Sequence, residues 1–577
     1  MMGRIKSYIR PYYLFILFTM LIKLAGAVAE LFVPYFMELI LSDCISGDHV
    51  KQSSVYLYGG MMLLCAGICL ALNITANHMS ALSAGRITQK LRHDLFQKLG
   101  SLSAKQLDEV TVSSAQSRLT SDTYHINQFL ARGQRLGIRA PILLVGGILM
   151  MLSMDAKLAL VPIALLPLIA VIVFFVTRKT IPLYTQEQGV LDRMVNVVQE
   201  NISGVRVIKA LSKTEYEKKR FAKVNDALSA TGAKAASVSS ITMPAASLVL
   251  NIGLTLVVLV GAYLVNSGDS TPSVIVAFLQ YFVMILNAML GVTRIFIMAS
   301  RGQSSALRVA DILEMPEDLV VQKSTNVQES APHIEFRNVH FSYTGVGSNL
   351  NNLSFRLQHG QTLGILGATG SGKSTLVNLL MRLYDVDEGE ILIDGRDVRT
   401  LAPEELRKKF GVVFQNDFIA EGTIESNIRF FRELSEEELS LAAEVAQAAE
   451  FIAGKEGGMQ AEVAVRGNNL SGGQKQRLLI ARALAAKPEI LVLDDASSAL
   501  DYRTDSMLRR ALAKRYADTT TILIAQRISS IRHADLILVL QDGELIGHGT
   551  HEELLASCEE YQLIAHTQMG TGEEAAV

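Results

Sequence analysis

Two adjacent acids, Asp494 and Asp495, follow an apolar run in the segment ILVLDDASSALD, residues 490–501. Such a run is typical of a buried parallel strand, which carries its last side chains to one edge of a sheet. In a site that hydrolyses a nucleotide, the first acid would hold a metal ion and the second would orient the attacking water. A turn or a helix cap is the other interpretation of this pair.

A phosphate-binding motif favours the chemical interpretation. The segment GATGSGKST matches G-x-x-x-x-G-K-[ST] from Gly367 to Ser374, between an expected strand, QTLGILG, and an apolar helix, TLVNLLMRL. The glycines let backbone N–H groups wrap phosphates, Lys373 reaches the terminal phosphates, and Ser374 can bind Mg²⁺ together with Asp494. The residues predicted to bind the nucleotide are Gly367, Ala368, Thr369, Gly370, Ser371, Gly372, Lys373, Ser374 and Thr375.

The chain that positions these residues is too long for one compact domain. It has 577 residues, of which 49% are hydrophobic and 19% charged, and the long apolar runs are confined to its first three hundred residues. The net charge of −2 gives no reason to expect nucleic-acid binding. The four cysteines are scattered, without a disulfide framework or a zinc spacing.

Runs of about 20 apolar residues predict membrane helices. Buried helices of a large soluble protein are the alternative, but runs such as LALVPIALLPLIAVIVFFV make it unattractive. Basic residues concentrate between the second and third runs and between the fourth and fifth, so the positive-inside rule predicts that both termini are cytoplasmic. The inner segments are long and polar, and we expect the membrane helices to continue into them. The six predicted spans are 13–41, 54–84, 133–153, 157–178, 241–265 and 273–299.

Several polar residues inside these runs are costly in lipid. A polar path for a substrate is one explanation. Hydrogen bonds between helices, or charges that reach toward the membrane surface, are the other. The residues concerned are Lys23, Glu30, Glu38, Asn251, Gln280 and Asn287.

The segment NLSGGQKQR, residues 469–477, resembles the signature motif of ATP-binding-cassette (ABC) proteins. With six apolar runs ahead of one cassette, nearly the whole chain resembles an ABC exporter half-transporter. The resemblance implies an α-helical transmembrane domain of six long helices that extend into the cytoplasm. It also implies an α/β P-loop nucleotide-binding domain with an antiparallel β subdomain and a helical signature subdomain. The expected domains are 1–305 (transmembrane), 306–332 (linker) and 333–577 (ATP-binding).

The resemblance also implies roles for single residues, with ATP and Mg²⁺ as the bound species. Tyr343 would stack on adenine, and Gln415 would reach Mg²⁺ and relay movement to the membrane domain. Asp501 would communicate across a dimer. The signature residues would cap the nucleotide bound to the opposite subunit; they are Leu470, Ser471, Gly472, Gly473 and Gln474.

Two positions depart from the family pattern. Asp495 stands where the family normally has Glu, which withdraws the carboxylate by about 1 Å, and a misplacement of this size can cost about a hundredfold in rate. Gln526, in TTILIAQRISSIRHADLILVL, stands where His is expected, and an amide cannot supply a cationic ring. Because both residues should flank the same γ-phosphate, the sequence predicts a site that hydrolyses ATP slowly.

An intact signature beside a weak site predicts pairing with a second, non-identical half-transporter. The chain therefore resembles the degenerate-site subunit of a heterodimeric bacterial multidrug exporter in the plasma (inner) membrane. We expect it to move small amphipathic molecules, which could be drugs, lipids or peptides, across the lipid bilayer. An importer on an exporter-like fold, taking up metal chelates, and an ATP-gated membrane regulator are the alternatives.

Overall fold

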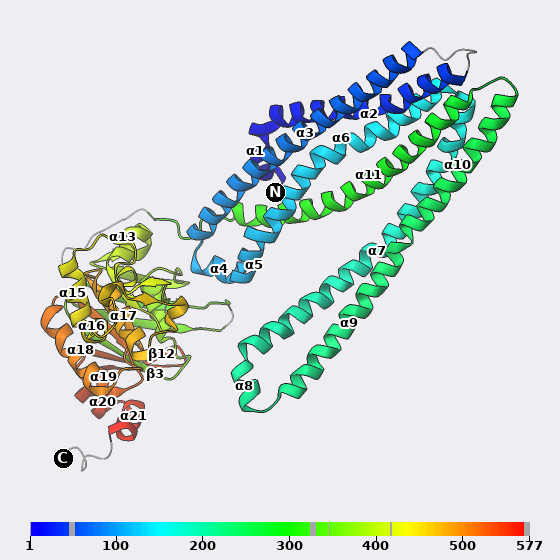
Figure 1. Cartoon of the computed structure of the whole chain (residues 1–577). Helices are drawn as coiled ribbons and strands as arrows, with labels where there is room; N and C mark the ends of the chain where they lie inside the picture. The colour runs from blue at the N-terminus through cyan, green and yellow to red at the C-terminus, as the bar shows by residue number, and fades with distance from the viewer. Residues whose placement is uncertain (1, 46–51, 323–330, 346, 416–417, 570–577) are drawn as a thin grey trace. The chain divides into compact units, whose positions relative to one another are not determined.

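The computed structural model describes residues 2–45, 52–322, 331–345, 347–415 and 418–569. The chain forms two compact units (Figure 1). The first comprises Met1–Gly100 and Val112–Met315, and the second comprises Ser101–Thr111 and Pro316–Val577. The short segment Ser101–Thr111 thus belongs to the second unit, although its flanking helices belong to the first.

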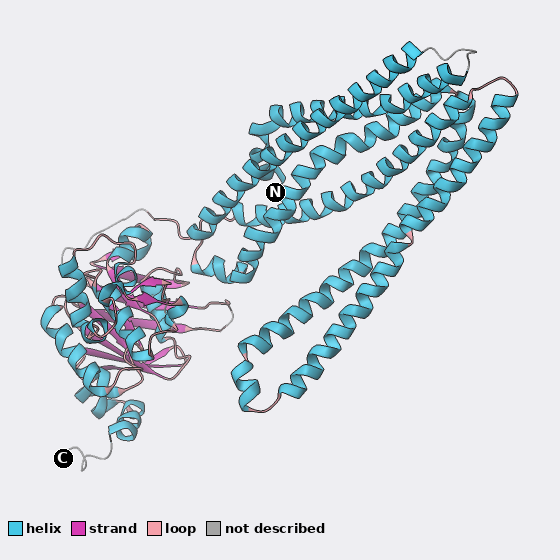
Figure 2. Ribbon diagram, viewed as in Figure 1, coloured by secondary structure: helices cyan, strands magenta, loops and turns pink. Residues whose placement is uncertain are grey.

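The first unit is entirely helical among its described residues (Figure 2). Six of its helical stretches are long and apolar enough to cross a membrane. The first five predicted spans fall within one each, and the sixth, 273–299, begins in the stretch Pro272–Val292 and continues along α11. The helices are α1 Met2–Ile9, α2 Tyr13–Ile45, α3 Gln52–Ser101, α5 Val112–Ser117, α6 Thr123–Met154, α7 Ala156–Ser203, α8 Val205–Ala210, α9 Thr214–Ser240, α10 Thr242–Asn266 and α11 Pro272–Leu313.

Several helices are much longer than a bilayer is thick. α3 has 50 residues and α7 has 48. At 1.5 Å per residue each extends over roughly 70 Å, whereas a hydrocarbon core is about 30 Å thick. These helices therefore continue beyond the bilayer, as predicted. α11 also runs to Leu313, into the segment expected to be a linker.

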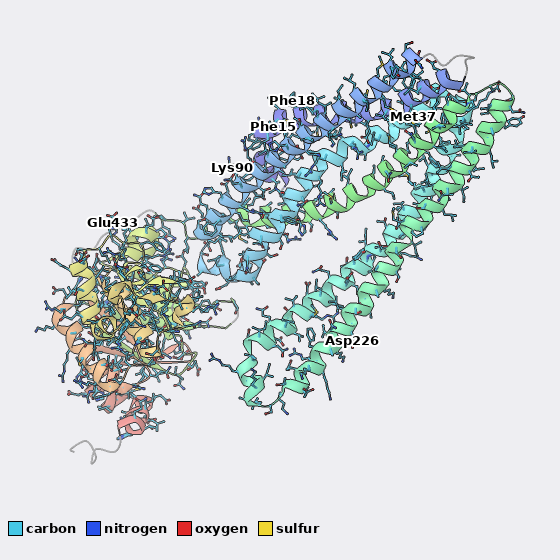
Figure 3. The ribbon with its side chains drawn as sticks, viewed as in Figure 1. Phe15, Phe18, Met37, Lys90, Asp226 and Glu433 are labelled. Atoms are coloured by element: carbon cyan, nitrogen blue, oxygen red, sulfur yellow. The ribbon has the colours of Figure 1, made fainter. Side chains whose placement is uncertain are left out.

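Close packing of α2, α6 and α11 forms the core of the membrane unit. Tyr281 of α11 is fully buried, and its hydroxyl donates to the backbone oxygen of Leu31 in α2 at 2.6 Å. A Cβ atom on Gly147 of α6 would lie 2.8 Å from Ile285 of α11, so the small residue permits this approach. On the outer side of α2, Phe18 is 57% exposed and extends from the bundle, as expected of a side chain facing lipid (Figure 3).

The second unit contains two main sheets. A four-stranded antiparallel sheet has the order β2-β1-β4-β5, and a six-stranded sheet has the order β12-β11-β3-β10-β9-β6, in which only β12 is antiparallel to its neighbour. The strands are β1 Ile334–Phe341, β2 Leu350–Leu357, β3 Thr362–Gly367, β4 Glu388–Ile393, β5 Arg396–Asp397, β6 Phe410–Val413, β7 Gly422–Thr423, β8 Glu462–Val463, β9 Ile490–Asp494, β10 Thr520–Ile524, β11 Leu536–Gln541 and β12 Glu544–Gly549.

Helices flank these sheets and form a separate apolar cluster around α14, α15 and α17. The segment TTILIAQRISSIRHADLILVL, residues 520–540, suggests a single strand in the sequence, but the short helix α19 separates β10 from β11. The helices of this unit are α4 Ala104–Val110, α12 Lys373–Leu380, α13 Pro403–Lys408, α14 Ile424–Arg429, α15 Glu436–Val445, α16 Ala449–Ala453, α17 Gly472–Leu484, α18 Tyr502–Arg515, α19 Ile528–Ile531, α20 His551–Ser557 and α21 Glu559–Met569.

Candidate nucleotide-binding site

The glycine-rich loop connects the end of β3 to the start of α12. Gly370 and Gly372 have positive φ angles of 87° and 98°, which side chains with a Cβ atom rarely adopt. A Cβ atom on Gly372 would also lie 2.8 Å from the backbone oxygen of Asn349. The hydroxyl oxygen of Ser371 is buried and has no hydrogen-bond partner among the described residues. A loop with an unpaired hydroxyl at the beginning of a helix fits an anionic phosphate.

Lys373 folds back over this loop. Its Nζ donates to the backbone oxygens of Gly367 at 2.8 Å and Ala368 at 2.7 Å. Burial lowers the pKa of the Lys373 ammonium, while the charges of Asp494 and Asp495 act in the opposite direction. Among the described residues the hydrogen bonds of the ammonium go to neutral carbonyls, and phosphate oxygens would bind it more strongly.

Asp494 and Ser374 form a pair suited to a magnesium ion. The hydroxyl of Ser374 donates to Oδ2 of Asp494 at 2.8 Å, and Asp494 is only 5% exposed. Burial raises the pKa of the Asp494 carboxyl, with the hydrogen bond from Ser374 opposing this shift. Hydroxyl, carboxylate and amide oxygens are ligands that Mg²⁺ accepts, so these two residues and Gln415 fit the ion.

Parallel strands bring the site residues to one sheet edge. β10 lies between β3 and β9, and Ile524 is in register with both Ile365 and Asp494. Beyond this edge is a cavity of about 220 Å³. It is lined by Asn349, Thr369, Gly370, Gly372, Lys373, Ser374, Thr375, Gln415, Asp494, Asp495, Ile524, Ala525 and Gln526. The structure thus gathers both acids, the lysine and both glutamines around one space.

Asp495 occupies an unusual backbone conformation directly after β9. Its φ is 52°, and its N–H donates to the backbone oxygen of Ile524 at 2.9 Å. Asp tolerates this left-handed region better than longer acids do, because its short side chain can hydrogen-bond locally. Burial raises the pKa of the Asp495 carboxyl, whereas Ser498, Arg527 and Lys373 act to lower it.

Two residues that line the cavity, Gln526 and Asn349, have contacts that the sequence did not indicate. Gln526 is exposed and its backbone oxygen accepts from Nε2 of Gln568 at 2.8 Å, which holds the segment after β10 in place. Asn349, which sequence reasoning missed, lines the cavity from the start of β2, and its Oδ1 accepts from the N–H of Tyr343 at 3.0 Å. No local motif marks Asn349, since its place depends on pairing between β1 and β2.

Comparison with known proteins agrees with this geometry. The model described as ABC transporter transmembrane region matches residues 16–289, and the model described as ABC transporter matches residues 350–498. The uncharacterized ABC transporter ATP-binding protein YfiB of Bacillus subtilis is 34% identical over 575 residues, which cover 99% of this chain and 99% of YfiB. This chain belongs to the ABC transporter family.

A second relative and a solved structure extend this result. The uncharacterized ABC transporter ATP-binding protein YknU of Bacillus subtilis is 32% identical over 569 residues, covering 98% of this chain and 97% of YknU. The structure of a bacterial Atm1-family ABC exporter with ATP bound matches with a TM-score of 0.83 and 25% identity, covering 97% of this chain and all of the other. The predicted fold class is therefore confirmed. The chain is an exporter-type ABC half-transporter, a multi-pass membrane protein whose cassette couples ATP hydrolysis to transport.

The signature residues of this ABC transporter lie outside the cavity around Lys373. Ser471 caps α17: its hydroxyl accepts from the N–H of Gln474, whose side chain accepts from the N–H of Ser471. Gly472 and Gly473 come close to Ala499, where a larger residue would crowd the chain. The beginning of α17 is therefore well ordered and separate from the chain's own phosphate loop, and the capping of a second nucleotide stays a prediction.

Asp501 acts locally as the cap of α18. Its carboxylate accepts from the N–H of Thr504 at 2.9 Å and from its hydroxyl at 2.8 Å. The N–H of Thr504 is the main cause of the lowered pKa of Asp501. Its carboxylate is thus held at a helix N-terminus, where a negative charge is favoured. Its role across a dimer stays a prediction.

Tyr343 belongs to an aromatic group next to α4. Its ring packs edge-on against Phe341 and Tyr384, with centroid distances of 4.8 and 5.0 Å, and it is 38% exposed. The hydroxyl of Tyr384 donates to Oδ2 of Asp108 in α4 at 2.6 Å. Ser103 and Gln106 add hydrogen bonds to Asp318 and to the backbone oxygen of Pro316. The segment predicted to receive adenine is thereby linked to α4, which lies between two membrane helices in the sequence.

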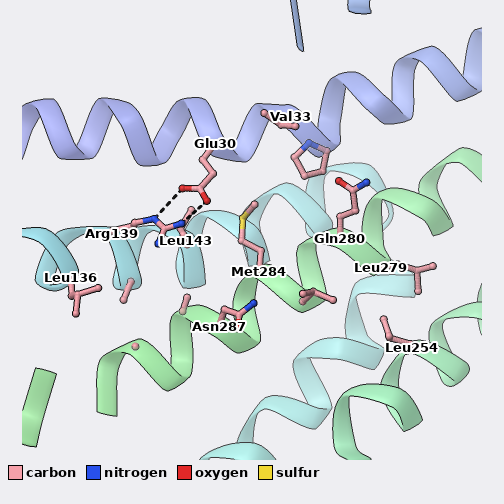
Figure 4. Close-up of a pocket in the computed structure, with 15 residues that line it drawn as sticks. Glu30, Val33, Leu136, Arg139, Leu143, Leu254, Leu279, Gln280, Met284 and Asn287 are labelled. Atoms are coloured by element: carbon pink, nitrogen blue, oxygen red, sulfur yellow. Dashed lines mark hydrogen bonds and ion pairs between the residues drawn. The ribbon is translucent and has the colours of Figure 1, made fainter. Parts of the chain in front are cut away.

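The membrane unit contains a cavity of about 610 Å³ between α2, α6, α10 and α11 (Figure 4). Glu30 and Arg139 face each other on one side, and the rest of the lining is mainly apolar (Figure 4). Nε and Nη2 of Arg139 donate to the two oxygens of Glu30 at 3.1 and 2.6 Å. Its full lining is Glu30, Val33, Pro34, Leu136, Arg139, Ala140, Leu143, Leu254, Leu279, Gln280, Val283, Met284, Asn287, Ala288 and Gly291.

The polar residues within the spans divide between the two explanations left open by the sequence. Glu30, Gln280 and Asn287 line the cavity. Lys23 instead donates to the side chains of Asn73 and Asn77, and Glu38 accepts from the hydroxyl of Ser273; these contacts join helices. Asn251 is exposed and its side chain donates to the backbone oxygen of Ser247 on its own helix. Glu30 and Gln280 also bond to other helices, to Arg139 on α6 and Met37 on α2, so contacts between helices are observed and a polar path for a substrate stays a prediction.

Proposed function

We propose that this ABC half-transporter is the slow-hydrolysing subunit of a heterodimeric exporter of small amphipathic molecules. The supporting observation is that Asp495 and Gln526, the two departures from the family pattern, line the same cavity as Lys373. Both changes therefore act on one bound nucleotide. A single substitution elsewhere in the chain could be neutral. Two substitutions beside the same γ-phosphate both affect its hydrolysis.

The proposed roles follow from the site geometry. N–H groups of the loop from Gly367 to Gly372 surround the phosphates of ATP, and Lys373 exchanges its carbonyl partners for them. Ser374, Asp494 and Gln415 hold Mg²⁺, which when bound neutralises phosphate charge. Tyr343 stacks on adenine. Asp495 orients water from a carboxylate that ends about 1 Å short, and Gln526 offers a neutral amide.

A partner is needed because the signature residues of this chain cap a nucleotide that is bound to the phosphate loop of another subunit. In the proposed dimer, Leu470 to Gln474 cap ATP bound to the partner, and Asp501 lies near the subunit boundary. A second identical copy would create two weak sites. A non-identical partner with the usual Glu and His would give one fast site, while ATP at the Asp495 site holds the cassettes together. Bacillus subtilis carries at least two such relatives, YfiB and YknU, so unlike chains of this layout coexist in one bacterium.

The cavity in the membrane unit is the proposed substrate site. Its apolar lining suits the body of an amphipathic molecule, and Glu30, Arg139, Gln280 and Asn287 offer polar partners. We place the protein in a bacterial plasma membrane with both termini in the cytoplasm. The reason is the positive-inside rule, which puts the segments rich in Lys and Arg on the cytoplasmic side. ATP-dependent accumulation of a fluorescent amphiphile in inverted vesicles would support export, whereas ATP-dependent loss would support import.

The partner requirement gives a direct test. In lipid nanodiscs the isolated chain should hydrolyse ATP slowly, and the mixed dimer should turn over about a hundredfold faster. The partner is a half-transporter from the same organism with Asp-Glu at the end of the corresponding strand. Steady-state phosphate release measures both rates.

Two variants of the mixed dimer assign the fast site. Changing the partner's Glu to Gln should remove most turnover, whereas Asp495→Asn in this chain should leave most of it. Vigorous hydrolysis by the isolated chain as a homodimer would contradict the proposal. So would equal losses from the two substitutions.

A further inference from the structure

Three metal-ligating side chains meet in the second unit, away from the nucleotide cavity. His333 immediately precedes β1, His359 lies in the turn between β2 and β3, and Asp394 lies in the turn between β4 and β5. One ligand atom from each lies within 4.8 Å of the others. Nε2 of His359 donates to Oδ1 of Asp394 at 2.9 Å, and Nε2 of His333 is 4.0 Å from the same oxygen.

His333 is held in place by a hydrogen bond at its Nδ1 atom. Its side chain is completely buried, and Nδ1 lies 2.7 Å from the hydroxyl oxygen of Thr520. That oxygen also accepts from the N–H of Gly360 at 3.1 Å and lies 3.5 Å from the backbone oxygen of Gln358. When Nδ1 of His333 donates to this hydroxyl oxygen, the lone pair of the ring lies on Nε2, and this is the tautomer that a metal ion would select.

The other ring nitrogen of His333, Nε2, faces the cluster. Nε2 of His333 is buried and has no hydrogen-bond partner among the described residues. An unsatisfied buried polar atom is unfavourable, and a role in structure alone does not explain it. A bound cation would explain it, because a histidine ligand is commonly oriented by a hydrogen bond from its other ring nitrogen.

The neighbouring contacts decide which oxygen of Asp394 faces the two histidines. The rings of His333 and His359 stack with centroids 3.8 Å apart, and the N–H of Asp394 donates to the backbone oxygen of His333 at 3.0 Å, which holds the turn beside the ring. Lys409 approaches the other oxygen of Asp394, Oδ2, at 3.7 Å and also pairs with Glu489. Oδ1 of Asp394 is thus the oxygen that faces the two histidines.

We propose that His333, His359 and Asp394 form a Zn²⁺ site. Two imidazoles and one carboxylate are ligands that Zn²⁺ prefers, and water would complete a tetrahedral shell. Zn–N distances are about 2.0 to 2.1 Å, so the ligand atoms must move closer together. His333 is fixed, but the side chain of His359 is 63% exposed and can turn out of the stack. The inference is independent of the proposed function.

Zinc at this position would fasten three segments together. The first is the start of β1, where the chain enters the nucleotide-binding sheets, and the others are the β2–β3 and β4–β5 turns. Thr520, which orients His333, begins β10 of the six-stranded sheet. Binding should therefore stabilise the junction between the antiparallel sheet and the sheet that carries the phosphate loop.

The test uses the full chain in lipid nanodiscs, purified without a polyhistidine tag and without nucleotide. Zn²⁺ alone is titrated in competition with a fluorescent zinc chelator. We expect one high-affinity Zn²⁺ per chain, not displaced by excess Mg²⁺, and binding weakened at least about 10-fold by His359→Ala or Asp394→Asn. His548→Ala, which removes an exposed histidine outside the cluster, is the matched control and should bind normally.

A second measurement separates this site from zinc bound elsewhere. Zn²⁺ should raise the unfolding temperature of the wild type and of His548→Ala but not that of His359→Ala. The main variant alters an exposed side chain, so it should fold even if substitutions of the buried His333 do not. The inference is wrong if the wild type binds no Zn²⁺ at micromolar concentration, or if His359→Ala and Asp394→Asn leave affinity and stabilisation unchanged.

Discussion

Asp495→Glu is expected to raise ATP hydrolysis by the isolated chain about 10- to 100-fold. The added methylene advances the carboxylate by about 1 Å toward the γ-phosphate, and errors of this size in a catalytic group cost up to about a hundredfold. Combining it with Gln526→His should increase the rate further, since the two side chains line one cavity. Steady-state phosphate release in nanodiscs at saturating ATP measures the effect.

The backbone at this position sets a limit on the gain. Asp495 has a φ of 52°, in the left-handed region of the backbone. Glutamate adopts this conformation less readily than aspartate, and the conformation costs about 1 to 2 kcal/mol per residue. Unfolding temperatures should therefore accompany the rates. Asp495→Asn is the matched control, because it keeps the short side chain and its tolerance of this conformation but cannot act as a base. If neither Asp495→Glu nor the double variant exceeds the wild type, the weak-site proposal fails.

The nucleotide site was largely predictable because its parts are local. The glycine pattern from Gly367 to Ser374 requires a strand before it and a helix after it, and β3 and α12 are where that pattern places them. The apolar run before Asp494 predicts a buried strand, and β9 is separated from β3 by one strand of the sheet. Once both strands are parallel, their carboxyl ends share an edge, and the acids meet the lysine without further information.

Contacts between distant segments could not be predicted in this way. Asn349 reaches the cavity through the pairing of β1 with β2. The zinc cluster joins His333, His359 and Asp394, which belong to separate turns with no metal-binding spacing. They meet because β1 pairs with both β2 and β4, so that Ile334 lies opposite Leu357 and Ile393, and no window of sequence contains this pairing.

The membrane charges illustrate the same limit. Sequence alone marked Glu30 as costly in lipid but did not identify its partner, which is 109 residues away on another helix. Which face of α6 meets α2 depends on small differences in helix packing, not on hydropathy. The pair becomes visible only in the folded unit, and it leads to the second large prediction.

Arg139→Gln is expected to destabilise the membrane unit by about 3 kcal/mol, since it leaves Glu30 as an unpaired charge at membrane depth. Glu30→Gln should have a similar effect by isolating Arg139. The guanidinium now holds both oxygens of Glu30, so one substitution removes two hydrogen bonds. Unfolding of the reconstituted protein by denaturing detergent, followed by tyrosine fluorescence, measures each loss.

The double variant Glu30→Gln/Arg139→Gln decides whether the cost comes from the unpaired charge. It should recover most of the stability, because two facing amides carry no charge into the bilayer. Lys157→Gln is the matched control: Lys157 pairs with Asp269, but their side chains are 69% and 50% exposed, so its loss should cost less than about 1 kcal/mol. A double variant as unstable as either single one would mean that the cavity needs these charges for its shape. If the double variant recovers its stability but amphiphiles stimulate its ATPase activity differently from that of the wild type, the pair takes part in substrate binding.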